Sequence, residues 1–359
     1  MTKNNNQGRN YSINGPENQW AKEKGLAAAE WYVSPISRKR LKELMVRKDG
    51  PAIRDTLLWL GLLVFFGFLG VYTWGTWWAV PVFIIYGTLY SAAADARWHE
   101  CQHGTAFRTP WMNKVVYQIA SFLNLRPATT SYWSHIWHHT DTIIVGLDPE
   151  IVGRPPVWRI LLSNLIRLHG GLLDQKRNLL HFFGKLNDAE MLYTPVSEHR
   201  KAFWEARITF LILLGVVISC FMTGSLLPAM LIGLPTFYGT VVFILLALPQ
   251  HLGLSEDVLD HRLNTRTFHT NIIFRFIYWN MNYHIEHHMF PMVPYHALPA
   301  LHKEVKDDYP PAYPNLWAAL KEVYKAIQAQ RKDVSYSYVP PLPATAQPYK
   351  FGPTLSQNP

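Results

Sequence analysis

Two long stretches of the chain contain no charged residue. One runs from Thr56 to Ala94 and the other from Ile208 to Ser255, and they hold 39 and 48 residues. A helix that crosses the hydrocarbon core of a bilayer needs about 20 apolar residues, so each stretch is long enough for two crossings joined by a tight turn. The pattern predicts four membrane-spanning helices, at residues 56–73, 77–94, 208–224 and 228–249.

Turn-forming and interfacial residues interrupt both stretches near their middles. In the first they are Trp74, Gly75, Trp77 and Trp78, and in the second they are Thr223, Gly224, Ser225 and Pro228. Tryptophan is enriched at membrane–water interfaces, and glycine and proline interrupt helices. The expected fold is therefore an all-α integral membrane protein with two transmembrane hairpins and a cytoplasmic helical cap. The alternative, two buried hairpins of a large soluble core, is disfavoured because core helices do not need charge-free runs of this length.

The distribution of lysine and arginine predicts how these hairpins are oriented. Neither residue occurs in the two short turns, whereas residues 38–54 carry Arg38, Lys39, Arg40, Lys42, Arg47, Lys48 and Arg54. The positive-inside rule then places both termini and the region between the hairpins in the cytoplasm. The net charge of +9 suits an anionic membrane surface and an acidic redox partner. Nucleic acid is not an expected partner, because no reader motif accompanies the charge.

These features predict an order of segments along the chain. They are a partly surface-lying N-terminal segment (1–53), hairpin 1 (54–97), a cytoplasmic region (98–203), hairpin 2 (204–250), a second cytoplasmic region (251–332) and an extended Pro-rich tail (333–359). Residues 1–30 are polar, lack a signal-peptide core and are expected to be disordered or loosely attached. Apolar residues at helical spacing predict a helix over Asn315–Lys332. Cys101 and Cys220 form no disulfide or zinc pattern and are expected to be packing residues.

Eight of the 16 histidines lie in three short segments. The segments are His99-Glu100-Cys101-Gln102-His103, His135-Ile136-Trp137-His138-His139 and His284-Ile285-Glu286-His287-His288. Each contains a histidine pair four residues apart, which share one face of a helix. Neutral imidazole is a good ligand for iron, copper and zinc, and eight imidazoles exceed what one metal can bind. Because the predicted topology puts all three segments on one side of the membrane, they are expected to converge on two metal ions.

The three segments resemble the histidine boxes of the membrane fatty acid desaturase and hydroxylase superfamily in order and spacing. The resemblance covers roughly residues 50–305 and includes Asp148-Pro149-Glu150 and the Met289-Phe290-Pro291 run after the third box. It implies two iron ions that use O2 to attack an aliphatic C–H bond, with desaturation and hydroxylation both open. It also implies a ninth histidine ligand before the third box, for which His251 is preferred over His261 and His269. The implied ligand set is His99, His103, His135, His138, His139, His251, His284, His287 and His288.

The resemblance also implies partners for the site. Ligating imidazoles need a hydrogen-bond partner on the second nitrogen, and the candidates are Glu100, Asp141, Asp148, Glu150, Asn280, Asn282 and Glu286.

The expected substrate is a fatty acyl or other lipid chain. A small polar metabolite, such as a rhizopine-like or dihydrorhizobitoxine-like compound, is the alternative. No heme-binding module follows the third box, so a separate donor such as a ferredoxin with its reductase is expected. The expected location is a bacterial inner membrane.

Other interpretations account for less of the pattern. His99-Glu100-Cys101-Gln102-His103 also fits the HExxH motif of zinc metalloproteases, but an intramembrane protease would leave the other two boxes without a role. A non-enzymatic metal or heme carrier is a further alternative. A soluble-type di-iron carboxylate bundle needs two Glu-x-x-His motifs, and the sequence has only the one formed by Glu100 and His103. His169, His181 and His199 are expected to be surface residues, and His296 and His302 to be structural.

Overall fold

The chain is almost entirely helical, as the pattern of apolar residues predicts. The computed structural model describes residues 9–151, 153, 155 and 157–352. Over these residues the only β-pairing consists of two isolated bridges, Thr267 with Tyr283 and Phe268 with Tyr313. The all-α class is confirmed.

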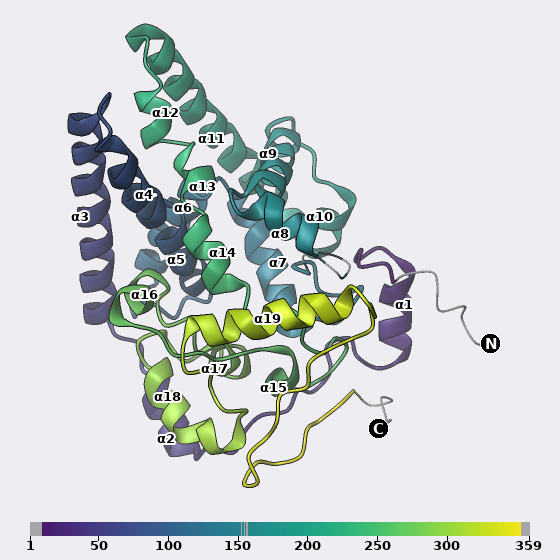
Figure 1. Cartoon of the computed structure of the whole chain (residues 1–359). Coiled ribbons are helices and arrows are strands. Elements are labelled where there is room, and N and C mark those ends of the chain that lie inside the picture. Colours follow the sequence, from purple (N-terminus) through teal and green to yellow (C-terminus); the bar gives the residue numbers. More distant parts are fainter. Residues whose placement is uncertain (1–8, 152, 154, 156, 353–359) are drawn as a thin grey trace.

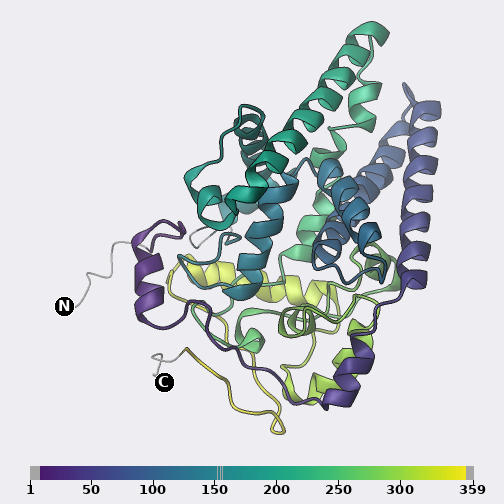
Figure 2. The same ribbon diagram turned by 180° about the vertical axis from the view of Figure 1, so that it is seen from behind.

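Three helical segments of the described chain are long and apolar enough to cross a membrane. They are Arg38–Thr73, Ala79–Gln102 and Val196–Thr223. The first contains α2 (Arg38–Leu44) and α3 (Asp49–Thr73), the second contains α4 (Ala79–Tyr90) and α5 (Ala92–Gln102), and the third is α11 (Val196–Thr223). In both views α3, α4 and α11 extend beyond the rest of the molecule in the same direction (Figures 1 and 2).

The outer surfaces of these long helices are apolar and exposed. Phe68 on α3 is 72% exposed and Phe221 on α11 is 83% exposed, and both helices carry several further exposed aliphatic residues. Only the helix formed by α4 and α5 is mostly buried. Apolar surface of this extent marks contact with an apolar environment, here the lipid of a membrane.

Both predicted hairpin turns lie where the interrupting residues placed them. Helix α3 ends at Thr73 and α4 begins at Ala79. Helix α11 ends at Thr223, and Gly224 follows in the left-handed conformation, with φ 59°, that commonly closes a helix. The sequence prediction therefore had the correct positions for both turns.

The segment predicted as the fourth span, 228–249, differs from the expectation because it is not one helix. It forms α12 (Leu227–Leu231), α13 (Pro235–Tyr238) and α14 (Val241–Ala247). Pro235 cannot continue a helix because it has no N–H and its ring clashes with the preceding turn. Gly233 has φ 95°, a conformation that favours glycine. Together they redirect the chain between α12 and α13.

Side-chain hydroxyls bond several of the backbone carbonyls in and beside the broken segment. Tyr86 donates to the carbonyl of Leu231 at 2.7 Å, and Tyr238 donates to that of Met230 at 2.8 Å. Thr236 donates to the carbonyl of Leu123 at 2.6 Å. Such bonds stabilise an irregular backbone in an apolar environment, where an unpaired polar group is costly.

The remaining helices form a cap around the ends of the long ones. Helix α19 (Leu316–Gln330), which corresponds to the predicted Asn315–Lys332 helix, crosses one face of the molecule (Figure 1), and the side chain of Asn315 caps its N-terminus. The cap helices are α6 (Pro110–Leu123), α7 (Ala128–Thr140), α8 (Trp158–Asn164), α9 (Leu168–Phe182), α10 (Asp188–Tyr193), α15 (His261–Asn264), α16 (Ile272–Ile277), α17 (His284–Met289), α18 (Leu298–Val305), the 3-10 helix Lys306–Asp308 and α19 (Leu316–Gln330).

The N-terminal segment is packed, contrary to the expectation for residues 1–30. Residues 9–30 include α1 (Pro16–Glu23), and Ala21 and Leu26 are fully buried in a small core with Ile144 and Leu259. A few apolar side chains therefore suffice to dock a largely polar segment. Residues 1–8 and 353–359 lie outside the described part, and residues 333–352 contain no helix, as predicted for the tail.

Candidate metal centre

Three helices and one turn bring the histidine boxes together. Helix α5 carries His99 and is capped by His103, α7 carries the second box and α17 the third. His251 lies in the turn that follows α14. Residues four apart on a helix share one face, so each box presents two or three imidazoles in the same direction.

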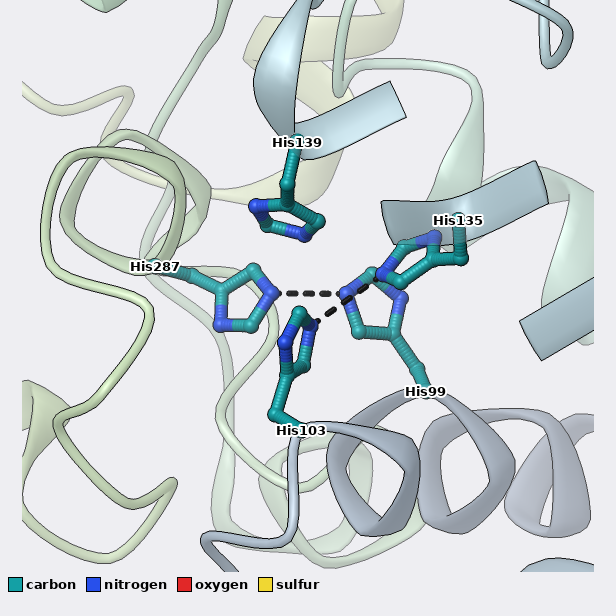
Figure 3. A group of neighbouring side chains, drawn as sticks. All are labelled: His99, His103, His135, His139 and His287. Atoms are coloured by element: carbon teal, nitrogen blue, oxygen red, sulfur yellow. Dashed lines mark hydrogen bonds between the residues drawn. The ribbon is translucent and has the colours of Figure 1, made fainter. Parts of the chain in front are cut away.

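Five imidazoles form the first cluster, and each offers a nitrogen within 4.8 Å of the others (Figure 3). Its members are His99, His103, His135, His139 and His287. The Nε2 atoms of His99 and His287 are 2.7 Å apart, and those of His103 and His135 are 3.2 Å apart. Three elements far apart in the sequence, α5, α7 and α17, thus converge on one small volume.

A second cluster lies directly beside the first. His138, His251 and His288 have nitrogens within 4.8 Å of one another. The Nε2 atom of His284 is 3.1 Å from the Nε2 atoms of both His251 and His288. The rings of His139 and His288 stack across the two clusters with centroids 4.3 Å apart. All nine histidines of the expected ligand set therefore meet in two adjoining groups.

Hydrogen bonds determine the tautomer of three imidazoles in the second cluster. The Nδ1 atom of His251 lies 2.9 Å from the carbonyl of Asn264, and that of His138 lies 2.8 Å from the Asp148 carboxylate. Carbonyl and carboxylate oxygens only accept, so both Nδ1 atoms donate. Thr142 donates its hydroxyl proton to the carbonyl of His138, and its oxygen therefore accepts from Nδ1 of His288 at 3.2 Å.

In their neutral forms these three rings keep the lone pair on Nε2, the nitrogen that is left to bind a metal, and the rings lie close together. Lone pairs that converge in a buried volume repel unless a cation lies between them, and neutral imidazole is the form that binds a transition metal. The first cluster adds a buried His139 with no hydrogen-bond partner on either nitrogen among the described residues. The residues present therefore fit two metal ions.

Burial keeps most of these rings neutral. It lowers the pKa of His139, His251, His287 and His288 well below the usual value, and the neighbouring imidazoles add to the effect. His138 differs. Burial opposes its charged form, but Asp148 outweighs burial and raises the pKa of His138 to about 9. The Asp148–His138 pair thus favours positive charge at this ring, which a bound cation would also supply.

The comparison with known families agrees with this geometry. The model of the fatty acid desaturase family matches residues 75–319, which include all nine clustered histidines. The chain belongs to the fatty acid desaturase family. This confirms the resemblance drawn from the three boxes and implies oxidation of the desaturase or hydroxylase type. A search of curated proteins found no match.

Two of the seven expected carboxylate and amide partners contact a clustered imidazole in this desaturase-family chain. Asp148 accepts from His138, and Glu150 lies 3.1 Å from Nδ1 of His135. Burial alone would raise the pKa of Glu150, but the contact with His135 lowers it to about 2. Both side chains therefore hold a ring with its Nε2 directed into a cluster.

The other five candidates are placed on different groups. Glu100 accepts from Thr105 and from the backbone N–H of Tyr295, and Asp141 accepts from the N–H of Ala28. The amides of Asn280 and Asn282 donate to backbone carbonyls. Glu286 accepts from Thr267 at 2.6 Å and pairs with His302. Their contacts brace the loops around the boxes and do not reach the ligating nitrogens.

Three partners of the clustered rings were missed by sequence reasoning. Thr142 and the carbonyl of Asn264 hold His288 and His251, and the side-chain amide of Gln250 lies 3.3 Å from Nδ1 of His284. Thr142 follows the second box closely and Gln250 precedes His251, so proximity was a usable signal for both. The contact made by the Asn264 carbonyl could not be predicted in this way, because every residue type has a backbone carbonyl.

The histidines outside the clusters have other contacts. His261 stacks on Trp31 with ring centroids 4.3 Å apart, and exposed His269 packs against Tyr283 and His302. Neither belongs to a cluster, which agrees with the preference for His251. His181 was expected at the surface, but it is buried, since its Nε2 pairs with the buried carboxylate of Glu190 at 3.0 Å.

A cavity of about 460 Å³ opens beside the two clusters. Five of the clustered histidines line it: His99, His135, His138, His251 and His284. This volume is within the range of small-molecule sites. The cavity is therefore the place where a substrate can reach the histidines.

Proposed function

We propose that this chain is a membrane-bound, O2-dependent di-iron enzyme that desaturates or hydroxylates an aliphatic C–H bond. The observation that supports the proposal most strongly is the pair of adjoining histidine clusters, whose rings lie close together, at the wall of a cavity. His99, His103, His135, His139 and His287 would hold one iron, and His138, His251, His284 and His288 the other. Histidine-rich shells of this kind suit redox-active iron.

The reaction balances with an external source of two electrons. Desaturation consumes R–CH2–CH2–R′, O2, two electrons and two protons and gives R–CH=CH–R′ and two water molecules. Hydroxylation consumes R–H with the same co-reactants and gives R–OH and one water. The bound irons supply the oxidising chemistry, while the protein holds the rings in place through Asp148, Glu150 and Thr142 and excludes bulk water by burial.

The proposal includes a membrane orientation. The broken segment α12–α14 would serve as the second half of hairpin 2, giving four crossings, with both termini and the histidine clusters on the cytoplasmic side of a bacterial inner membrane. A ferredoxin with its reductase would deliver electrons to the basic cytoplasmic face. The basic side chains of residues 38–54 support this docking by charge, because ferredoxin-type carriers are acidic.

Removing the metal tests the proposal. Chelator treatment of the purified, detergent-solubilised protein is expected to abolish O2 consumption coupled to product formation, since the clusters have no other redox group. Fe²⁺ added back under reducing conditions should restore activity, whereas Zn²⁺ should not, because zinc has no redox chemistry. Oxidation that survives chelation, or that zinc restores, would contradict the proposed function.

A further inference from the structure

The cavity beside the histidines has two unlike walls. Phe243 and Ile244 of α14, with Leu248 just after it, form an apolar wall. Asp95, Arg126, Asp174 and Arg177 form a polar, charged wall, which meets the apolar one where the guanidinium carbon of Arg126 lies 5.9 Å from the ring centre of Phe243. A cavity shaped for an acyl chain would be expected to have apolar side chains throughout, because buried charge is costly without a partner.

Most of the charges on the polar wall are already paired. Arg177 donates to Glu190 at 2.6 Å, to Asp174 at 3.1 Å and to Thr130 at 3.0 Å. Asp174 also accepts from Arg167 at 2.7 Å. These side chains form a closed network, so they shape the wall and leave little capacity for a ligand.

Arg126 is different because its guanidinium is only partly used. Its one ion pair among the described residues is with Asp95, at 2.6 Å; 17% of the Arg126 side chain is accessible, and the residue lines the cavity. A guanidinium has five N–H donors, arranged to bind carboxylate or phosphate in a bidentate way. Arg126 therefore has donors to spare at the surface that a substrate would touch.

The position of Arg126 relative to the histidines limits the size of the ligand. Its guanidinium carbon stacks 4.2 Å from the ring centre of Trp98, and the Trp98 ring is 5.6 Å from that of His135. One indole thus separates the cation from the first cluster. An anionic group held by Arg126 would lie only a few bonds from a carbon at the clusters.

We propose, resting on the proposed function, that the substrate is a compact water-soluble molecule with a carboxylate or phosphate group bound by Arg126. Oxidation takes place at a carbon a few bonds from that group. The hydroxyl of Ser131 and the side-chain carbonyl oxygen of Gln250, two residues that also line the cavity, offer hydrogen bonds to further polar groups of such a molecule. The apolar side formed by α14 accommodates its aliphatic part. The cavity thereby favours the polar metabolite over the acyl lipid that the family resemblance alone favoured.

Mass spectrometry of cells that express the protein tests this substrate class. Water-soluble and lipid extracts are compared for wild type, Arg126→Gln, Arg126→Lys and the control Lys201→Gln. Lys201 also pairs with a carboxylate, that of Glu198 at 3.7 Å, but lies on α11 outside the cavity lining. An O2-dependent product is expected in the water-soluble extract, lost in Arg126→Gln and unaffected in Lys201→Gln.

Kinetics of the purified variants on that product's precursor separate binding from folding. Loss of a charge-assisted contact should raise KM about 10- to 100-fold in Arg126→Gln, with partial recovery in Arg126→Lys and with iron content and kcat unchanged in both. The melting temperature of Arg126→Gln is expected to fall in either case, because the buried Asp95 loses its partner. A purely structural role would instead lower iron content and kcat and leave KM unchanged.

Different results would contradict the polar substrate and the di-iron oxidation. An oxidised product confined to acyl lipids, formed equally by Arg126→Gln, would overturn the polar substrate while leaving the di-iron oxidation intact. Iron-loaded protein that forms no O2-dependent product in either extract would overturn both.

Discussion

Replacing His251 with alanine is expected to abolish turnover and to reduce the bound iron from two to about one per chain. His251 belongs to the cluster with only four imidazoles, and its Nε2 lone pair is directed inward by the bond from Nδ1 to Asn264. The five-membered cluster shares no ligand with it. One iron should therefore remain bound, but a single iron cannot perform the two-metal chemistry. Iron analysis and product formation on the purified variant provide the measurement.

His261→Phe is the matched control for this result. His261 is the neighbouring candidate in sequence, and it stacks on Trp31 with its centroid 5.2 Å from that of His288. Phenylalanine preserves the ring stacking and the burial but cannot bind a metal. This variant should keep both irons and its activity. Loss of one iron in His261→Phe together with normal iron content in His251→Ala would show that His261, and not His251, is the ninth ligand.

Replacing Gly239 with valine is expected to prevent assembly of the membrane-embedded half. An ideal Cβ at Gly239 would lie 1.9 Å from the carbonyl oxygen of Gly87, and one at Gly87 would lie 2.4 Å from the ring of Tyr238. Here α4 and the junction of α13 and α14 approach backbone to backbone. Overpacking costs about 1–3 kcal/mol where side chains can move aside, and a backbone contact offers less relief. We expect little monodisperse protein in detergent, a lower melting temperature and little bound iron.

Gly215→Val separates this contact from a general effect of valine in a membrane helix. Gly215 lies within α11, and an added Cβ there would meet no atom within 4 Å. Its stability and iron content should match those of wild type. A Gly239→Val protein that also behaves like wild type would mean that α14 is not held against α4 as described.

The membrane elements were predictable to the extent that charge alone specifies them. Absence of charge located α3, α4 and α11, because it reports where side chains can leave water. The turn-forming and interfacial residues located both hairpin turns. Neither signal reports the backbone geometry within a span. The division of 228–249 into three helices depends on Pro235, Gly233 and the close approach at Gly239. These residues change the direction of the chain without changing its charge pattern.

The histidines were predictable because metal binding needs a specific residue type at a specific helical spacing. The groups that orient the rings were only partly predictable. Asp148 and Glu150 stand close to the second box in sequence, whereas Asn264 acts through its backbone carbonyl and Glu286 pairs with a distant His302. The residues of the charged cavity wall come from α5, the loop at Arg126 and α9, and no local sequence pattern predicts that they lie together.

Locating the metals in the purified protein tests whether each histidine cluster binds an iron ion. Anomalous diffraction at the iron K edge from crystals of the membrane protein should reveal two iron positions per chain. One should lie among His99, His103, His135, His139 and His287, and the other among His138, His251, His284 and His288. A single zinc ion held by His99 and His103, or iron bound away from these rings, would rule out the proposed two-iron site.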